Sequence, residues 1–182
     1  MWTAKINGRL CEEVERTVHA ELPRETDWTA VSINEKLLRI VAIISGNAFL
    51  GPDLCHREEY LHASIQYAID VFGAVRALKK WPRLLRPVAR YFVPQLWRVA
   101  EHKKRAKSFF LPAIRERRAI MQRGEKLPDD MLQWMLPKAK MFNIHDDAEL
   151  AYQQLSLTLA AIHSTAMTMT HMYVNPEPVN HC

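Results

Sequence analysis

The sequence predicts an all-α protein in a single domain. No segment shows the sustained alternation of apolar and polar residues that is typical of a strand, whereas several segments repeat apolar residues at helical spacing. The 182 residues include five glycines and ten prolines, which favours helices with defined ends over a glycine-rich sheet protein. Hydrophobic residues make up 48% and charged residues 25%, as in a folded chain rather than a disordered one.

The first two predicted helices lie near the N-terminus. Residues 10–21 form an amphipathic helix that should stop before Pro23. Its apolar face is expected to consist of Leu10, Val14 and Val18. The second helix follows Ser32 and ends at Gly51–Pro52. Glu35 stands three residues after Ser32, so the sequence predicts a capping box at the start of this helix.

The next segments are two long helices joined by a proline-rich connection. A helix over residues 58–78 should bury one face, made of Leu61, Ile65, Ala68, Ile69 and Phe72. Residues 79–95 should form a loop with short helical turns, because its three prolines interrupt any long helix. A strongly basic helix then runs over residues 96–122, with a bend at Pro112 and an end at Gly124.

The last predicted helix, residues 148–173, carries almost no charge. A short helix that starts at Pro128–Asp129–Asp130 and ends before Pro137 precedes it, and "HDDAEL" places acids where the helix dipole favours them. From Leu150 to Pro176 there is no Asp, Glu, Lys or Arg. This length is sufficient for a bilayer, but the many Gln, Ser, Thr and His residues argue against lipid surroundings. We therefore expect a helix at the centre of a large soluble domain.

One stretch of this helix, "AAIHSTAMT", resembles the oxygen-binding segment of the central helix of cytochromes P450, [AG]-G-x-[DE]-T-[TS], in the form found among fungal enzymes with His in place of the acid. By this resemblance Ala160 and Ala161 take the small-residue places where the helix passes over the haem. His163 takes the place of the acid, Ser164 that of the threonine, and Thr165 that of the following hydroxyl. The sequence departs from the pattern at Ala161, His163 and Ser164.

The resemblance extends over most of the chain, from about residue 10 to residue 173. Residues 27–61 resemble the fungal P450 segment that leads to the helices above the substrate, residues 79–95 the connection between those helices, and residues 98–118 the second of them. The fold implied is a partial cytochrome P450 fold that contains the central helices only, within one incomplete domain over residues 1–182.

The resemblance also implies roles for individual residues. Ala160 and Ala161 would leave room for dioxygen beside the haem, while Ser164, Thr165 and the proton carrier His163 would deliver protons to it. The alternative for His163 is an ordinary core histidine with satisfied hydrogen bonds. Phe72 and Met167 would contact the substrate. A single Glu59–His62 pair suggests no metal site and should form an exposed ion pair.

The haem-ligating loop of the family, Phe-x-x-Gly-x-Arg-x-Cys-x-Gly, has no counterpart in this sequence. The three cysteines, Cys11, Cys55 and Cys182, show no CxxC or CxxH pattern, so neither a disulfide framework nor a zinc site is predicted. We expect that the chain does not hold haem stably and is inactive alone. The far side of the uncharged helix should then be exposed as an apolar patch.

The parent enzyme implied by the resemblance is a haem-thiolate monooxygenase on the cytoplasmic face of the endoplasmic reticulum membrane. It would oxidise a small lipophilic substrate, such as a terpenoid or polyketide, with dioxygen and electrons from NADPH–cytochrome P450 reductase. No membrane anchor is predicted in this chain. The alternative is a non-enzymatic helical protein that binds an acidic membrane or a partner through its basic segment.

The basic segment itself allows several interpretations. Between Arg76 and Arg118 there are fourteen Lys or Arg and two acids, interleaved with aromatic residues. Basic and aromatic residues together are found in nucleic-acid-binding proteins, but no nucleic-acid motif accompanies them. The connection of the resembled family faces the membrane, where arginines suit phosphate groups and aromatic rings suit the interface. We therefore predict membrane contact for Trp81–Trp97 and no nucleic-acid binding.

Overall fold

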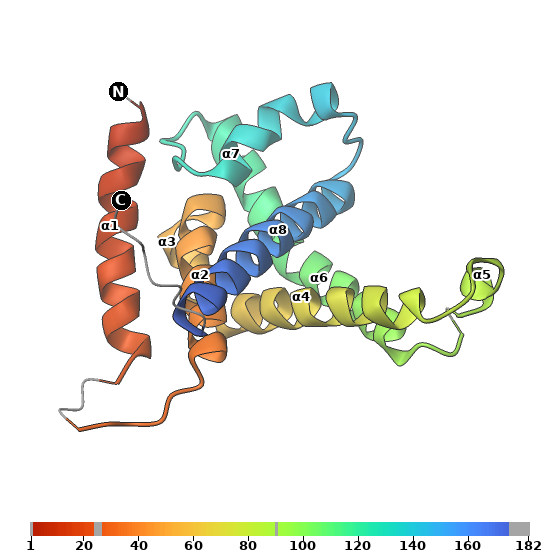
Figure 1. Cartoon of the computed structure of the whole chain (residues 1–182). Helices are drawn as coiled ribbons and strands as arrows, with labels where there is room; N and C mark the ends of the chain where they lie inside the picture. The colour runs from red at the N-terminus through yellow and green to blue at the C-terminus, as the bar shows by residue number, and fades with distance from the viewer. Residues whose placement is uncertain (1, 24–26, 90, 175–182) are drawn as a thin grey trace, which may run out of the picture.

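A long diagonal helix organises the molecule (Figure 1). The computed structural model describes residues 2–23, 27–89 and 91–174, with side chains from Asn7 onward, and these residues contain helices and no strand. The predicted all-α class is thus confirmed for the described part of the chain. The diagonal helix is α8 (Asp147–Val174). Three helices pack on it: α2 (Ile33–Leu50), α4 (Glu58–Lys79) and α6 (Pro94–Arg123).

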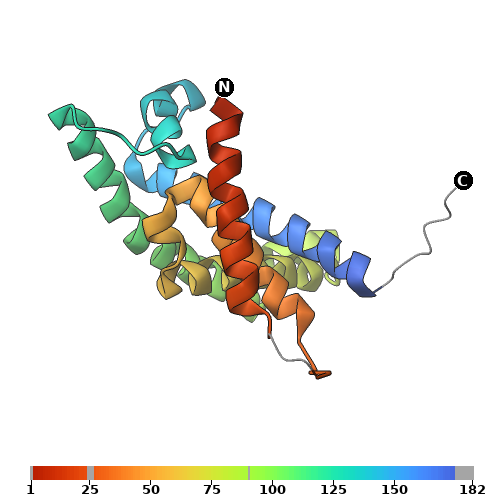
Figure 2. The same ribbon diagram turned by 90° about the vertical axis from the view of Figure 1, so that its left-hand side faces the viewer.

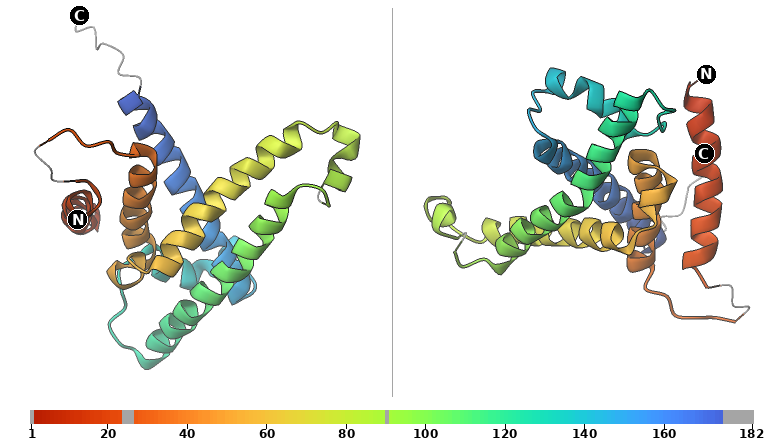
Figure 3. Two further views of the ribbon diagram at one scale, coloured as in Figure 1. Left: turned by 90° about the horizontal axis from the view of Figure 1, so that it is seen from below. Right: turned by 180° about the vertical axis from the view of Figure 1, so that it is seen from behind.

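Helices α4 and α6 form a long arm with a turn-rich tip. The arm projects away from α1 (Trp2–Glu21), as Figures 1 and 3 show. The tip contains η1 (Arg83–Leu85) and α5 (Arg86–Ala89), so the predicted loop with short helical turns is present. Gly124 ends α6 in the left-handed conformation, with φ of 69°, as the sequence predicted.

A buried carboxylate joins the two helices of the arm. Asp70 of α4 accepts a hydrogen bond from Arg98 Nε at 2.8 Å, and its other oxygen lies 2.9 Å from His102 Nε2. Both partners belong to α6, and Asp70 and His102 are buried. This cluster fixes the register of the two helices, because a carboxylate in the interior must keep its hydrogen-bond partners.

The core lies where α2, α4, α6 and α8 meet. Its largest fully buried side chains include Tyr60, Leu61, Phe110, Ile114, Leu155 and Ile162. Tyr60 packs directly on the backbone of α2 at Gly46, where an added Cβ would lie 2.7 Å from the tyrosine ring. A glycine at this position therefore lets α4 approach α2 closely. The predicted apolar face of α4 is wrong at Ile69, which is exposed.

Three further short helical elements lie between the long helices of the described residues. α3 (Pro52–Cys55) follows α2 directly, with Pro52 as its first residue. α7 (Met131–Met135) and the 3₁₀ helix η2 (Leu136–Phe142) lead into α8. No helix of the described residues is long and apolar enough to cross a membrane.

The helix caps follow the sequence in two of three places. Asp130 caps α7, since its Oδ1 accepts a hydrogen bond from the Gln133 amide at 2.9 Å. Asp146 Oδ1 accepts from the Glu149 amide at 2.6 Å at the start of α8. The predicted capping box at Ser32 is wrong, because the Ser32 side chain accepts no hydrogen bond from α2.

Helix α1 buries a different face from the predicted one. It begins earlier, at Trp2, and its buried residues are Glu13 and Thr17, whereas Val14 is 40% exposed. The acid is buried because it finds polar partners on other elements: Asn47 Nδ2 donates to Glu13 Oε2 at 2.8 Å. The spacing of apolar residues within α1 gives no information about a polar partner on another helix. The predicted buried face of α1 is wrong for this reason.

A second buried ion pair holds α6 to the α2–α3 corner. Arg117 Nη2 donates to Asp130 Oδ2 at 2.8 Å and to the carbonyl oxygen of Leu50 at 3.2 Å. The Asp130 side chain is completely buried. Burial raises the pKa of Asp130, while the Gln133 amide and the charge of Arg117 oppose this rise. Asp130 thus serves both as the cap of α7 and as the partner of Arg117.

Candidate functional site

Helix α8 has one buried side and one exposed side. The buried residues recur at helical spacing and face α2, α4 and α6: Leu150, Ala151, Gln154, Leu155, Thr158, Ile162 and Ala166. The opposite side is exposed at Tyr152, Gln153, Ser156, Ala160, Ser164, Thr165, Met167 and Thr168. Figure 2 shows that α8 extends beyond the other helices toward its C-terminal end. The candidate site is this exposed side.

Small side chains and hydroxyl groups dominate the exposed side around Ala160. Ser156 Oγ donates to the Tyr152 carbonyl at 2.9 Å, Ser164 Oγ to the Ala160 carbonyl at 2.5 Å, and Thr168 Oγ1 to the Ser164 carbonyl at 2.8 Å. Each hydroxyl thereby satisfies its donor within the helix and keeps lone pairs that can accept a hydrogen bond. The surface is polar yet carries no fixed charge, and its backbone is within reach of a ligand beside Ala160.

The predicted apolar patch is correct in place but wrong in composition. The far side of α8 is exposed, as expected, but over the stretch from Ser156 to Ser164 it is lined by hydroxyl groups and alanine. Large apolar side chains are exposed at Tyr152, before this stretch, and toward the C-terminal end of α8, at Met167, Met172, Tyr173 and Val174.

His163 stacks on Phe72 of α4. Their ring centroids lie 3.5 Å apart and the planes differ by 15°. The structure therefore joins the predicted proton carrier to one of the two predicted substrate contacts. Helical spacing places Ala160, Ser164 and Met167 on the same side of α8 as His163. Ala161 is half-buried and Thr165 exposed, on the adjacent stripe of the helix.

Burial lowers the pKa of His163 below its ordinary value, and the positive charge of Arg76 lowers it further. The imidazole is therefore neutral at pH 7, where one ring nitrogen donates a hydrogen bond and the other accepts one. A neutral, partly exposed imidazole against an aromatic ring suits a group that passes protons without carrying a permanent charge.

We expect the pKa of His163 to rise when either cause of its shift is removed. Phe72→Ala should raise this pKa more than Arg76→Met, because burial is the larger cause. The measurement is an NMR titration of the His163 ring protons. Val75→Ala, which changes an exposed neighbour on the same helix, serves as the control and should leave the value unchanged. An unchanged pKa in Phe72→Ala would contradict the assigned cause.

The two described cysteines lie on other elements than the candidate site. Cys11 is exposed on α1, and Cys55 is buried at the end of α3, where its Sγ lies 3.4 Å from the Pro52 carbonyl oxygen. Burial raises the pKa of the Cys55 thiol to about 12. Cys182 and Pro176 lie outside the described residues. Small residues and hydroxyl groups on α8 fit a surface that would lie against a haem, whereas the described cysteines lie on α1 and α3.

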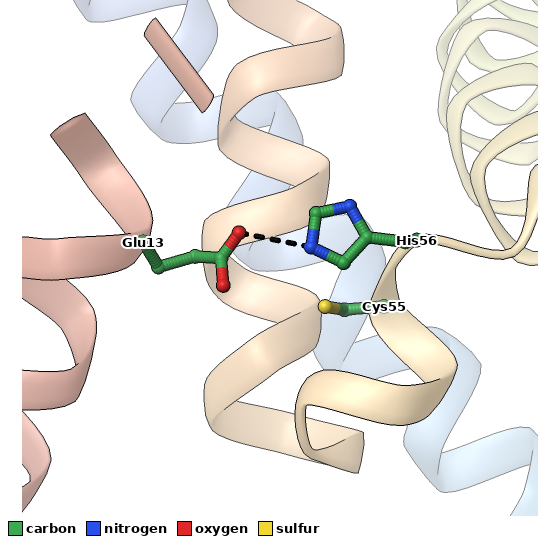
Figure 4. Close-up of side chains that lie close together, drawn as sticks. All are labelled: Glu13, Cys55 and His56. Atoms are coloured by element: carbon green, nitrogen blue, oxygen red, sulfur yellow. Dashed lines mark ion pairs between the residues drawn. The ribbon is translucent and has the colours of Figure 1, made fainter. Parts of the chain in front are cut away.

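The structure also contains a cluster of potential metal ligands that the sequence did not predict. Glu13, Cys55 and His56 come together between α1 and α3, as Figure 4 shows. Sequence spacing gave no signal for it beyond the adjacent Cys55 and His56, because Glu13 stands far away in the chain. Glu59 and His62 are both exposed, and the ion pair predicted between them stays a prediction.

Comparison with known proteins finds one matching family and several fungal relatives. The family described as "Cytochrome P450" matches residues 3–177. The chain is 36% identical to cytochrome P450 monooxygenase braC of Annulohypoxylon truncatum, over 90% of this chain and 33% of the relative. It is also 36% identical to cytochrome P450 monooxygenase ATR3 of Stachybotrys chlorohalonatus, over 89% of this chain and 34% of the relative.

A third fungal relative shows the same extent of similarity. Cytochrome P450 monooxygenase AN1598 of Emericella nidulans is 36% identical over 92% of this chain and 31% of the relative. The chain thus spans about a third of the length of the curated relatives it matches. No solved structure matches it.

Proposed function

This chain belongs to the cytochrome P450 family. From that premise we propose that it provides the oxygen-binding surface and the substrate-facing helices of a haem-thiolate monooxygenase. One observation carries the proposal: the exposed side of α8 at Ala160 and Ser164 is uncharged, has small side chains and carries hydroxyl groups. Such a surface admits a flat ligand and a small gas molecule, which a surface of long charged side chains would not.

The residues that would lie against the haem are Ala160 and Ala161. Bound haem supplies an iron at which dioxygen is activated with electrons from a reductase. Ala160 and Ala161 leave space above it, since neither extends beyond Cβ. Ser164 and Thr165 hold hydroxyl groups one turn further along the helix, and each can accept a proton from solvent and pass one on.

His163 is the proposed proton carrier of this surface. It is neutral and half-buried, so that it can exchange protons with solvent. Its stacking on Phe72 orients the ring between the hydroxyl-bearing side of α8 and the arm formed by α4 and α6. Phe72 and Met167 are proposed to contact the substrate, and the apolar character of both side chains supports a lipophilic molecule of the terpenoid or polyketide class.

The tip of the arm is proposed to contact a membrane. Several of its large apolar side chains are exposed, with Leu84 at 91% and Phe92 at 67%, and Trp81 and Phe92 form a pair with ring centroids 6.1 Å apart. Arginine and lysine flank them, so the tip combines apolar groups for the interface with cations for phosphate groups. This supports contact with an anionic membrane surface, and family membership adds the proposal that the surface is the cytoplasmic face of the endoplasmic reticulum, with NADPH–cytochrome P450 reductase as the partner. Family membership favours the enzyme over the non-enzymatic alternative.

The described residues alone are not expected to hold haem stably or to turn over substrate, because the sequence has no counterpart of the haem-ligating cysteine loop and the Cys55 thiol is buried with a raised pKa. Added haem should therefore give no thiolate-type Soret band when the purified chain is reduced under carbon monoxide. Appearance of that band would show that Cys11, Cys55 or Cys182 ligates the iron.

A chimera tests the proposed function directly. Residues 3–177 replace the aligned segment of one of the fungal relatives, which supplies the rest of a P450 chain. We expect the chimera to incorporate haem, to give the thiolate-type Soret band with carbon monoxide, and to oxidise the substrate of the relative with NADPH and reductase. A helical, monodisperse chimera that takes up no haem would contradict the proposal. Salt-sensitive binding to acidic vesicles without haem uptake would favour the non-enzymatic alternative.

A further inference from the structure

Three potential metal ligands meet at the junction of α1 and α3. Glu13 lies in the middle of α1, Cys55 is the last residue of α3, and His56 follows it. The carboxylate oxygen, the sulfur and the imidazole nitrogen all lie within 4.8 Å of one another. Figure 4 shows the three side chains converging, with His56 Nε2 3.0 Å from Glu13 Oε1. The site is separate from the exposed side of α8.

The surroundings hold these groups in place before any ion binds. Glu13 and Cys55 are buried, while the His56 side chain is exposed. Thr17 Oγ1 donates to Glu13 Oε1 at 3.1 Å, and Asn47 Nδ2 donates to Glu13 Oε2 at 2.8 Å. Partners of this kind orient a ligating carboxylate and raise the affinity of a metal site.

Glu13 is charged in the free protein. Burial raises its pKa, but hydrogen bonds from Arg16 and Thr17, with the charges of His56 and Arg16, outweigh burial and hold the pKa below its ordinary value. A carboxylate is therefore buried beside a thiol and an imidazole at neutral pH. A buried carboxylate requires a positive partner, and the free protein supplies one in Arg16.

We propose that Glu13, Cys55 and His56 bind one divalent cation of the zinc type, with water as the fourth ligand, and so clamp α1 to the end of α3. Sulfur, imidazole nitrogen and carboxylate oxygen are the donors that tetrahedral zinc uses. The thiolate excludes magnesium and calcium, which prefer oxygen ligands. The thiol loses its proton on binding, so carboxylate and thiolate together balance the two charges of the ion.

Arg16 competes with the proposed ion. Its guanidinium pairs with Glu13, and its Nη2 lies 3.1 Å from His56 Nε2, the nitrogen that the ion would use. The Arg16 side chain is 62% exposed, so it can turn into solvent when the ion arrives. Metal binding and the Arg16 contact exclude each other, and removal of Arg16 should therefore strengthen metal binding, whereas a purely structural ion pair predicts no such gain.

The test is a titration of the purified chain with Co²⁺, a spectroscopic substitute for zinc, followed by competition with Zn²⁺. The background is Cys11→Ser with Cys182→Ser, which leaves Cys55 as the only thiol. We expect one ion per chain, a near-ultraviolet thiolate-to-cobalt band, and its loss on addition of one equivalent of Zn²⁺. His56→Gln, an exposed change, should weaken binding at least about tenfold. Arg16→Gln should strengthen it.

Two controls separate the site from accidental binding. Cys55→Ser removes the thiolate and should abolish the band, with far-ultraviolet circular dichroism to confirm that the helices persist. His62→Gln changes an exposed histidine on α4 away from the cluster and should leave the affinity unchanged. Absence of a thiolate band in the background protein, or equal affinity in His56→Gln and the background, would overturn the proposal. The readout involves no haem, so it is independent of the proposed function.

Discussion

Replacement of Arg117 by methionine is expected to lower the free energy of unfolding by about 3–5 kcal/mol. The substitution keeps the length and packing of the side chain but leaves the fully buried Asp130 carboxylate without its positive partner. It also removes the hydrogen bond from Arg117 to the Leu50 carbonyl, which holds α6 to the end of α2. Urea denaturation followed by circular dichroism measures the change.

A matched substitution on the same helix shows whether burial is the cause. Arg123 pairs with Glu125 through groups that are both more than half exposed. Because exposed ion pairs contribute about 0–1 kcal/mol, Arg123→Met should have a small effect. Equal losses in the two variants would contradict the role assigned to the buried pair.

The pH dependence of Arg117→Met gives an independent readout. Burial already raises the pKa of Asp130 in the intact protein, and loss of the Arg117 charge should raise it further. An acid whose folded pKa lies above its unfolded value favours folding at low pH, and this contribution is lost as the pH rises through the folded pKa. The difference between Arg117→Met and the intact protein should therefore be smaller at pH 4 than at pH 7.

Loss of both hydroxyls at Ser164 and Thr165 is expected to lower substrate oxidation by the chimera about 10²-fold, the lower end of the range for assisted proton transfer. The two positions are adjacent and each can supply a hydroxyl, so the double variant Ser164→Ala with Thr165→Ala is required. Haem content and the carbon monoxide spectrum should not change, because both side chains are exposed in this chain. Product formed per NADPH consumed is the measurement.

Ser156→Ala is the matched control for this pair. Ser156 lies on the same exposed side of α8, two turns earlier, and makes the same kind of hydrogen bond to the carbonyl four residues before it. Its removal changes the helix in the same way but takes no hydroxyl from the proposed proton path. A similar drop in product for Ser156→Ala would show that helix geometry, and not proton delivery, accounts for the effect.

Several features of the structure are determined locally and could be predicted from the sequence. The end of α6 at Gly124 and the cap of α8 at Asp146 depend on backbone freedom and capping within a few residues. The turn-rich tip depends on its prolines, and the uncharged character of α8 is a property of composition. The residues that resemble the P450 motif on α8 likewise occupy consecutive positions, so the resemblance could be seen before any packing was known.

Only the tertiary structure decided which groups meet. The buried face of α1 is polar because Asn47 and His56, on other elements, contact Glu13. The spacing of Leu10 and Val18 within α1 could not reveal these two partners. The stacking of His163 on Phe72 depends on how α4 packs against α8. Apolar periodicity and capping residues indicate interactions within one helix, whereas contacts between residues on different helices depend on how the helices pack. The sequence by itself therefore determined the helices and the chemistry that α8 carries, and tertiary packing decided the partners of that chemistry and created the Glu13–Cys55–His56 cluster.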